Sequence, residues 1–191
     1  MKKVIGITGS IGSGKSYAVN MFKNICKKNK IDAVFINVDD VRRNILKQEN
    51  IDRDDLNRKI YNNEKEMEKY KQFINPKIRE YLIKQINVNN CFIFIEWALL
   101  IEDEFEDIVD SIIMIDCKRE IQIERLEKGD LGKEEVIKRI NLQLTNNQKK
   151  EKIKNINKET FIIDTTNNPE SDVYEEVFYI IEKAYSNLAK I

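Results

Sequence analysis

Residues 4–19, VIGITGSIGSGKSYAV, carry the strongest structural signal in the chain. Four of the six glycines lie within nine consecutive positions of this stretch: Gly6, Gly9, Gly12 and Gly14. Glycine gives up more backbone freedom on folding than any other residue, so such a cluster indicates that the backbone itself has a task. A β-branched run (2–8) precedes the loop, and apolar residues at helical spacing follow it. The stretch therefore predicts a strand, a glycine-rich loop and a helix.

Residues 9–16, GSIGSGKS, match the P-loop pattern G-x-x-x-x-G-K-[ST] in the strand-to-helix context that the pattern requires. Backbone N–H groups of such a loop wrap phosphates, and the following helix N-terminus adds positive potential. Lys15 is expected to bridge the β- and γ-phosphates, and the Ser16 hydroxyl to bind Mg²⁺. We expect the nucleotide-binding residues to be Gly9, Ser10, Ile11, Gly12, Ser13, Gly14, Lys15, Ser16 and Tyr17.

Four further apolar runs predict buried parallel strands, over 33–38, 91–97, 111–117 and 160–165. Helical patterns lie between them, at about 40–48, 52–89, 118–129, 133–155 and 171–190. This alternation predicts an α/β fold of three layers, with a five-stranded parallel sheet covered by helices on both faces. Asn75 and Pro76 predict a helix start within 52–89. We expect one domain over residues 1–191, because no linker or repeat interrupts the pattern.

Composition excludes several classes of protein. Lys plus Arg equals Asp plus Glu at 33 each, so we expect no nucleic-acid or anionic membrane partner. The three cysteines lack paired spacing and are expected to be buried, reduced thiols. The chain has no histidine, which excludes Ser-His and Cys-His nucleophiles and leaves chemistry to carboxylates, Lys, Arg and Mg²⁺. The first apolar run is too short for a signal or a span, so we expect a cytoplasmic protein.

Carboxylates follow two of the predicted strands. Asp39 is expected to end the second strand, with Asp40 after it, at the sheet edge where ligands of open α/β folds bind. We predict that Asp39 is the catalytic base that orients an attacking hydroxyl, although either aspartate could instead cap the next helix. Glu96 closes the run CFIFIE, where a Walker B acid would contact Mg²⁺, or could simply pair with a surface lysine.

Basic residues gather in two helical segments on either side of KGDLG, residues 128–132. They are Arg119, Arg125, Lys128, Lys133, Lys138 and Arg139. Because a transferring phosphoryl group carries dispersed negative charge, cations in a closed site stabilise it. We therefore predict that residues of about 118–150 form a helical lid, in which one or two of these side chains contact phosphate and the others lie on solvated faces.

With these motifs the chain resembles the dephospho-coenzyme A kinase family, P-loop kinases that phosphorylate a ribose 3′-hydroxyl with ATP. IGITGSIGSGKS is similar to the family's opening motif, and FINVDDVRR resembles the motif that supplies the base, here Asp39, and a substrate-binding arginine, here Arg43. FIEWALLIE is similar to the segment that contains Pro-Leu-Leu, and QIERL and RINLQ resemble the lid. The matching residues in these last three segments are Leu99, Leu100, Glu102, Gln122, Arg125, Arg139 and Gln143.

The resemblance implies the cofactors ATP and Mg²⁺, the latter at Ser16 and Glu96. It also implies catalytic roles for Asp39, Lys15 and Arg139, and an acceptor-binding region over about 50–89. The substrate-binding residues would be Arg43, Leu99, Glu102 and Arg125. The chain departs from the family at Ala98, where the proline stands, and at Gly129, where an arginine stands.

Three functions remain open from the sequence. The first is phosphorylation of dephospho-coenzyme A, and the second is the same chemistry on a nucleoside or nucleotide. The third is a nucleotide-binding regulatory module without transfer activity, which the changes at Ala98 and Gly129 would suit. In each case we expect a monomer or a weak homo-oligomer.

Overall fold

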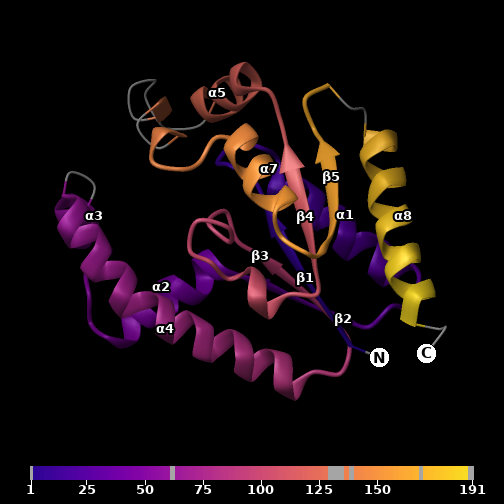
Figure 1. Ribbon diagram of the computed structural model, residues 1–191, viewed down its shortest axis with the longest axis horizontal. Helices are drawn as coiled ribbons and strands as arrows, with labels where there is room; N and C mark the ends of the chain where they lie inside the picture. The colour runs from indigo at the N-terminus through magenta and orange to yellow at the C-terminus, as the bar shows by residue number, and fades with distance from the viewer. Residues whose placement is uncertain (1, 61–62, 129–135, 138–139, 168–169, 189–191) are drawn as a thin grey trace.

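The computed structural model describes residues 2–60, 63–128, 136–137, 140–167 and 170–188. Its centre is one parallel sheet with the strand order β2-β3-β1-β4-β5 (Figure 1). The strands are β1 (Lys3–Thr8), β2 (Ala33–Asn37), β3 (Phe92–Glu96), β4 (Ser111–Asp116) and β5 (Glu159–Asp164). Each predicted strand is present, with ends that differ from the prediction by at most one residue. The expected α/β class is confirmed.

Helices cover both faces of the sheet. They are α1 (Lys15–Lys28), α2 (Val38–Gln48), α3 (Arg53–Ile60), α4 (Glu64–Val88), the 3₁₀ turn η1 (Glu106–Ile108), α5 (Arg119–Glu127), α7 (Asn146–Lys154) and α8 (Glu170–Leu188). Alternate strand residues point to opposite faces, so each strand supplies two cores. Ile93 and Ile95 of β3 pack with α2, α4 and α7, whereas Phe92 and Phe94 pack with α1 and α8.

The strand order determines where a ligand can bind. After β1 the chain crosses to β2 at one edge of the sheet, and after β3 it crosses back past β1 to β4. Connections that leave neighbouring strands in opposite directions open a crevice at their carboxyl ends. The glycine-rich loop after β1 and Glu96 at the end of β3 both lie at this crevice, since Ile7 and Glu96 are register partners.

The predicted helix start at Asn75 and Pro76 is wrong. Pro76 lies inside α4, which begins after Asn63, whose side chain accepts hydrogen bonds from the N–H groups of Lys65 and Glu66. An interior proline removes one helical hydrogen bond. Buried apolar residues recur every four positions around it, at Ile74, Ile78 and Leu82. Their packing in the core stabilises the helix on both sides of the proline.

The predicted helix over 133–155 is also wrong in its described part. Residues 136–137 and 140–141 are helical, but α7 starts afresh at Asn146. Thr145 caps it: its hydroxyl accepts from the N–H of Gln148, and the Gln148 side chain accepts from the N–H of Thr145. This capping box makes a new helix start, so residues 142–145 connect two separate helical segments.

The three thiols behave as the sequence predicts. Cys26, Cys91 and Cys117 are buried and unpaired. Burial raises the pKa of the Cys26 thiol to about 11. Within the described ranges, no helix combines the length and the apolar character needed to cross a membrane.

Candidate active site at the phosphate loop

The glycines of the loop occupy positions that a side chain would not tolerate. Gly9, Gly12 and Gly14 have φ angles of 144°, 76° and 88°. A Cβ atom on Gly9 would lie 2.4 Å from the carbonyl oxygen of Ile115, which leaves no room for any other residue. Gly14 precedes α1 and offers no side-chain cap to its first turn. The first N–H groups of α1 thus face the loop, as an anion site requires.

Lys15 begins α1, and its ammonium donates to the carbonyl of Ser10 at 3.1 Å. The pKa of Lys15 is lowered from 10.5 to about 8, chiefly by burial and in part by the positive charge of Lys149. The carboxylates of Glu96, Asp39 and Glu102 oppose this shift. A partly desolvated cation surrounded by acids is prepared for a polyanion, which would hold it in the charged state.

Ser16 and Glu96 are brought together, as the sequence predicts. The Ser16 hydroxyl donates to Glu96 Oε1 at 3.1 Å, and the Asn37 amide donates to Glu96 Oε2 at 3.0 Å. Among the described residues, no three His, Cys, Asp or Glu side chains form a group that could hold a metal ion. One hydroxyl beside one carboxylate fits Mg²⁺, which keeps several waters and takes its other ligands from nucleotide phosphates.

Asp39 does not end β2. The strand ends at Asn37, whose side chain caps α2 by accepting from the N–H of Asp40, and Asp39 lies in the first turn of that helix. The reason is that Asn37, which precedes both aspartates, supplies the capping oxygen. The Asp39 carboxylate is 55% exposed and lies 2.6 Å from the Arg42 guanidinium. Its negative charge opposes the lowering of the Lys15 pKa.

The sequence did not predict that Arg42 and Tyr70 lie beside Asp39. Arg42, rather than Arg43, pairs with Asp39, whereas Arg43 pairs with Asp40. Tyr70 of α4 hydrogen-bonds to Arg42, and burial raises the pKa of its hydroxyl. Tyr70 is far from Arg42 in sequence, so no local spacing could have revealed this contact.

The predicted acceptor residues after β3 point in different directions. Leu99 is half-buried against the core. Glu102 faces inward, where its Oε1 accepts from the Lys149 ammonium at 2.5 Å and from the N–H of Leu144 at 3.1 Å. Lys149 is fully buried. In the sequence it is one lysine among several in α7, so nothing marked it as part of the site.

Arg125 lies beside the phosphate loop. Its guanidinium donates to the Thr165 hydroxyl at 3.0 Å and to the Thr165 carbonyl at 2.5 Å. One of its nitrogens is 3.3 Å from the place where a Cβ on Gly14 would stand. Tyr17, at the start of α1, is 43% exposed. Arg139, Lys133 and Lys138 lie outside the described residues, as does Gly129.

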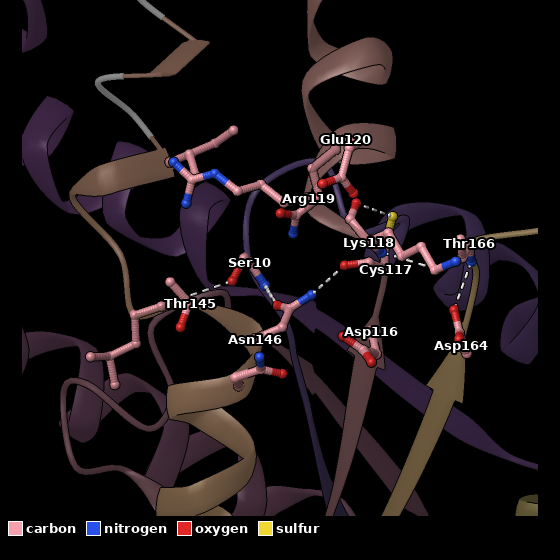
Figure 2. Close-up of a pocket in the computed structure, with 14 residues that line it drawn as sticks. Ser10, Asp116, Cys117, Lys118, Arg119, Glu120, Thr145, Asn146, Asp164 and Thr166 are labelled. Carbon is pink, nitrogen blue, oxygen red and sulfur yellow. Dashed lines mark hydrogen bonds between the residues drawn. The ribbon is translucent and has the colours of Figure 1, made fainter.

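A cavity of about 480 Å³ lies behind the loop, between the first turns of α5 and α7 and the ends of β4 and β5 (Figure 2). Ser10 is the one predicted nucleotide-binding residue in its lining. Figure 2 shows the Asn146 side chain between Ser10 and Cys117, to both of which it hydrogen-bonds. Lys15 and Ser16 are not among the residues that line the cavity.

Comparison with known proteins agrees with this geometry. A family model described as dephospho-CoA kinase matches residues 3–160. The dephospho-CoA kinase of Bacillus licheniformis is 30% identical, over 80% of this chain and 85% of that protein. The dephospho-CoA kinase of Listeria innocua is 25% identical, over 98% of this chain and 100% of that protein.

The fold has a close relative among solved structures. The crystal structure of TT1252 from Thermus thermophilus matches with a TM-score of 0.81, over 96% of this chain and 97% of that one. At 18% identity this likeness concerns the fold alone. The family model, however, spans every strand from β1 to the beginning of β5 and includes the whole phosphate loop. On that match, this chain belongs to the dephospho-CoA kinase family.

Proposed function

We propose that this protein transfers the γ-phosphoryl group of ATP to the ribose 3′-hydroxyl of dephospho-coenzyme A, which gives ADP and coenzyme A. Membership of the family makes the chain an ATP-dependent kinase of a small molecule. The observation that carries the proposal is the grouping of Lys15, Ser16 and Glu96 at the crevice between β1 and β3, in a chain that matches this family over residues 3–160.

The phosphate loop holds the nucleotide. Backbone N–H groups of the loop and of the first turn of α1 bind the phosphates, and Lys15 bridges the β- and γ-phosphates. Ser16 would hold Mg²⁺ directly and Glu96 would hold it through water, and Mg²⁺ held there would supply positive charge next to the phosphates. Arg125, beside Gly14, adds a cation next to the loop, and Arg139 is proposed as the lid arginine that contacts the transferring group.

The acceptor binds on the side of α2 and α4. Asp39 is exposed and its charge acts on Lys15, so we propose that its carboxylate accepts the proton of the 3′-hydroxyl as that oxygen attacks the γ-phosphorus. Arg42 orients the carboxylate by its ion pair. Arg43 and Leu99 are proposed to contact the acceptor. The internal contacts of Glu102 favour a supporting role for it instead.

Release of ADP from Mg-ATP tests the acceptor. We expect dephospho-coenzyme A to stimulate release at least tenfold above the rate with water alone, and nucleosides and nucleotides to leave that rate unchanged. Stimulation by a nucleoside or nucleotide instead would keep the kinase and overturn the proposed acceptor. ATP binding without stimulation by any acceptor would favour the regulatory module.

We also propose a cytoplasmic location and a monomer or weak homo-oligomer. The substrates, ATP and a dephosphorylated coenzyme, support the first. The balance of 33 basic and 33 acidic residues supports the absence of a nucleic-acid partner.

A further inference from the structure

Residues 143–146, which lead into α7, form hydrogen bonds to the first half of the phosphate loop. The N–H of Ser10 donates to Asn146 Oδ1 at 3.3 Å, and its hydroxyl donates to the carbonyl of Leu144 at 3.0 Å. The N–H of Ile11 donates to Gln143 Oε1 at 2.9 Å. These three hydrogen bonds join Ser10 and Ile11 to the residues that lead into α7.

One turn further along α7, Lys149 anchors the same segment. It is fully buried, and its ammonium donates to the carbonyl of Ala98 at 2.7 Å and to Glu102. Thr8, the last residue of β1, donates to that same carbonyl at 3.2 Å. Glu102 in turn accepts from the N–H of Leu144. We call Gln143, Leu144, Asn146 and Lys149 the brace.

The brace joins two parts of the active site. At one end it meets the start of the loop at Ser10 and Ile11, and at the other it meets the turn that directly follows Glu96. Burying a lysine and a glutamate costs free energy that their attraction only partly offsets, so such a pair is weak evidence for a contribution to stability. Because the brace hydrogen-bonds to both sides of the crevice, its contacts favour a role in arranging the ATP site.

We propose that Lys149 is a positioning residue: through the brace and Glu102 it fixes the phosphate loop against the turn after Glu96, in the arrangement that binds ATP. Lys149 is fully buried and acts through its contacts with Ala98 and Glu102. The inference requires only that the loop binds ATP, so it is tested with nucleotide alone and can fail independently of the proposed acceptor.

The first test removes the contact at the loop. Gln143 is half-buried, so Gln143→Ala is expected to fold normally. It leaves the N–H of Ile11 without its acceptor, and we expect the Kd for Mg-ATP, measured by calorimetry, to rise about threefold to tenfold. Gln72→Ala on the surface of α4 is the matched control and should leave Kd unchanged. An unchanged Kd in Gln143→Ala would overturn the role of the brace.

The second test separates positioning from stability. Lys149→Met strands the Glu102 charge and should lower both the melting temperature and ATP affinity, whereas Lys154→Met, at an exposed pair on the same helix, should change neither. The double variant Lys149→Met with Glu102→Met removes both charges and should recover most of the melting temperature. It still lacks the bonds to Ala98 and Leu144, so its Kd for Mg-ATP should stay about tenfold above that of the unchanged protein.

The double variant decides between the two roles. Recovery of the melting temperature with weak ATP binding supports a positioning role. Recovery of both would show that the pair serves stability alone and would overturn the proposal. Turnover gives an independent reading: the KM for ATP should rise while the KM for dephospho-coenzyme A stays within twofold.

Discussion

At the scale of single residues, the unusual pKa of Lys15 has a kinetic consequence. Its pKa is lowered to about 8, chiefly by burial, so the free protein loses this charge as the pH rises above 8. Only the charged form binds phosphates well. We therefore expect kcat/KM for ATP to be constant below about pH 7.5 and to fall above pH 8, toward tenfold per pH unit.

Bound nucleotide should shift the pH at which the rate begins to fall. Phosphate charges favour the ammonium, so kcat, which reports the complex, should begin to fall at a higher pH than kcat/KM does. Steady-state rates between pH 6.5 and 9.5 measure both profiles. A kcat/KM that stays level up to pH 9.5 would contradict the assigned pKa.

Asp39 gives a second prediction for a single residue. Asp39→Asn keeps the size of the side chain but cannot accept a proton, so turnover should fall by about 10²-fold to 10⁴-fold while the Kd for Mg-ATP stays within threefold. Asp40→Asn is the matched control, because Asp40 is equally exposed and pairs with Arg43 instead. Full activity in Asp39→Asn would rule out Asp39 as the base.

The parts of the site that the sequence predicted are those with a local signal. Gly9, Gly12 and Gly14 stand out by spacing, and Ser16 and Glu96 meet because the parallel strands β1 and β3 end side by side. Arg42 with Tyr70 and Lys149 with Glu102 were missed as pairs because their partners lie on other elements. Long-range side-chain contacts leave no periodic pattern in the chain.

At the scale of elements, strands were easier to predict than helix ends. A strand buried on both faces must be a continuous apolar run, so its ends are visible in composition. A helix end depends on which of several polar residues becomes the cap. Asn75 with Pro76 looked like a start, but Asn63 provides the cap, and Asn75 hydrogen-bonds to Asp103. Tertiary contacts decided between equally good local signals.

The start of α7 gives a prediction at this scale. Thr145→Ala removes the hydroxyl that caps the helix and should lower the free energy of unfolding by about 1 kcal/mol. Thr145→Ser keeps the oxygen and should stay within a few tenths of a kcal/mol of the unchanged protein. Urea unfolding followed by circular dichroism measures both. Equal midpoints for the alanine variant and the unchanged protein would show that the helix does not start there.

At the scale of the whole molecule, the strand order brings the parts of the site together. Residues from β1, α1, α2, β3 and the turn after it all reach the crevice where the connections diverge. The two cores on either side of the sheet hold these elements rigidly, so ligand contacts at the crevice act on the folded state as a unit. Binding at the loop should therefore register in the stability of the entire chain.

Thermal unfolding tests this coupling. A ligand at about 100 times its Kd stabilises the folded state by about 2.7 kcal/mol. For a chain of this size that corresponds to a rise of about 5 to 11 °C in melting temperature. Mg-ATP should produce such a shift in the unchanged protein and also in Asp39→Asn, in which binding is kept and chemistry is not. Lys15→Ala lacks the phosphate clamp and should show less than 2 °C. An equal shift in Lys15→Ala would place the nucleotide somewhere other than the loop at residues 9–16, and the roles assigned to Ser16 and Glu96 would fall with it.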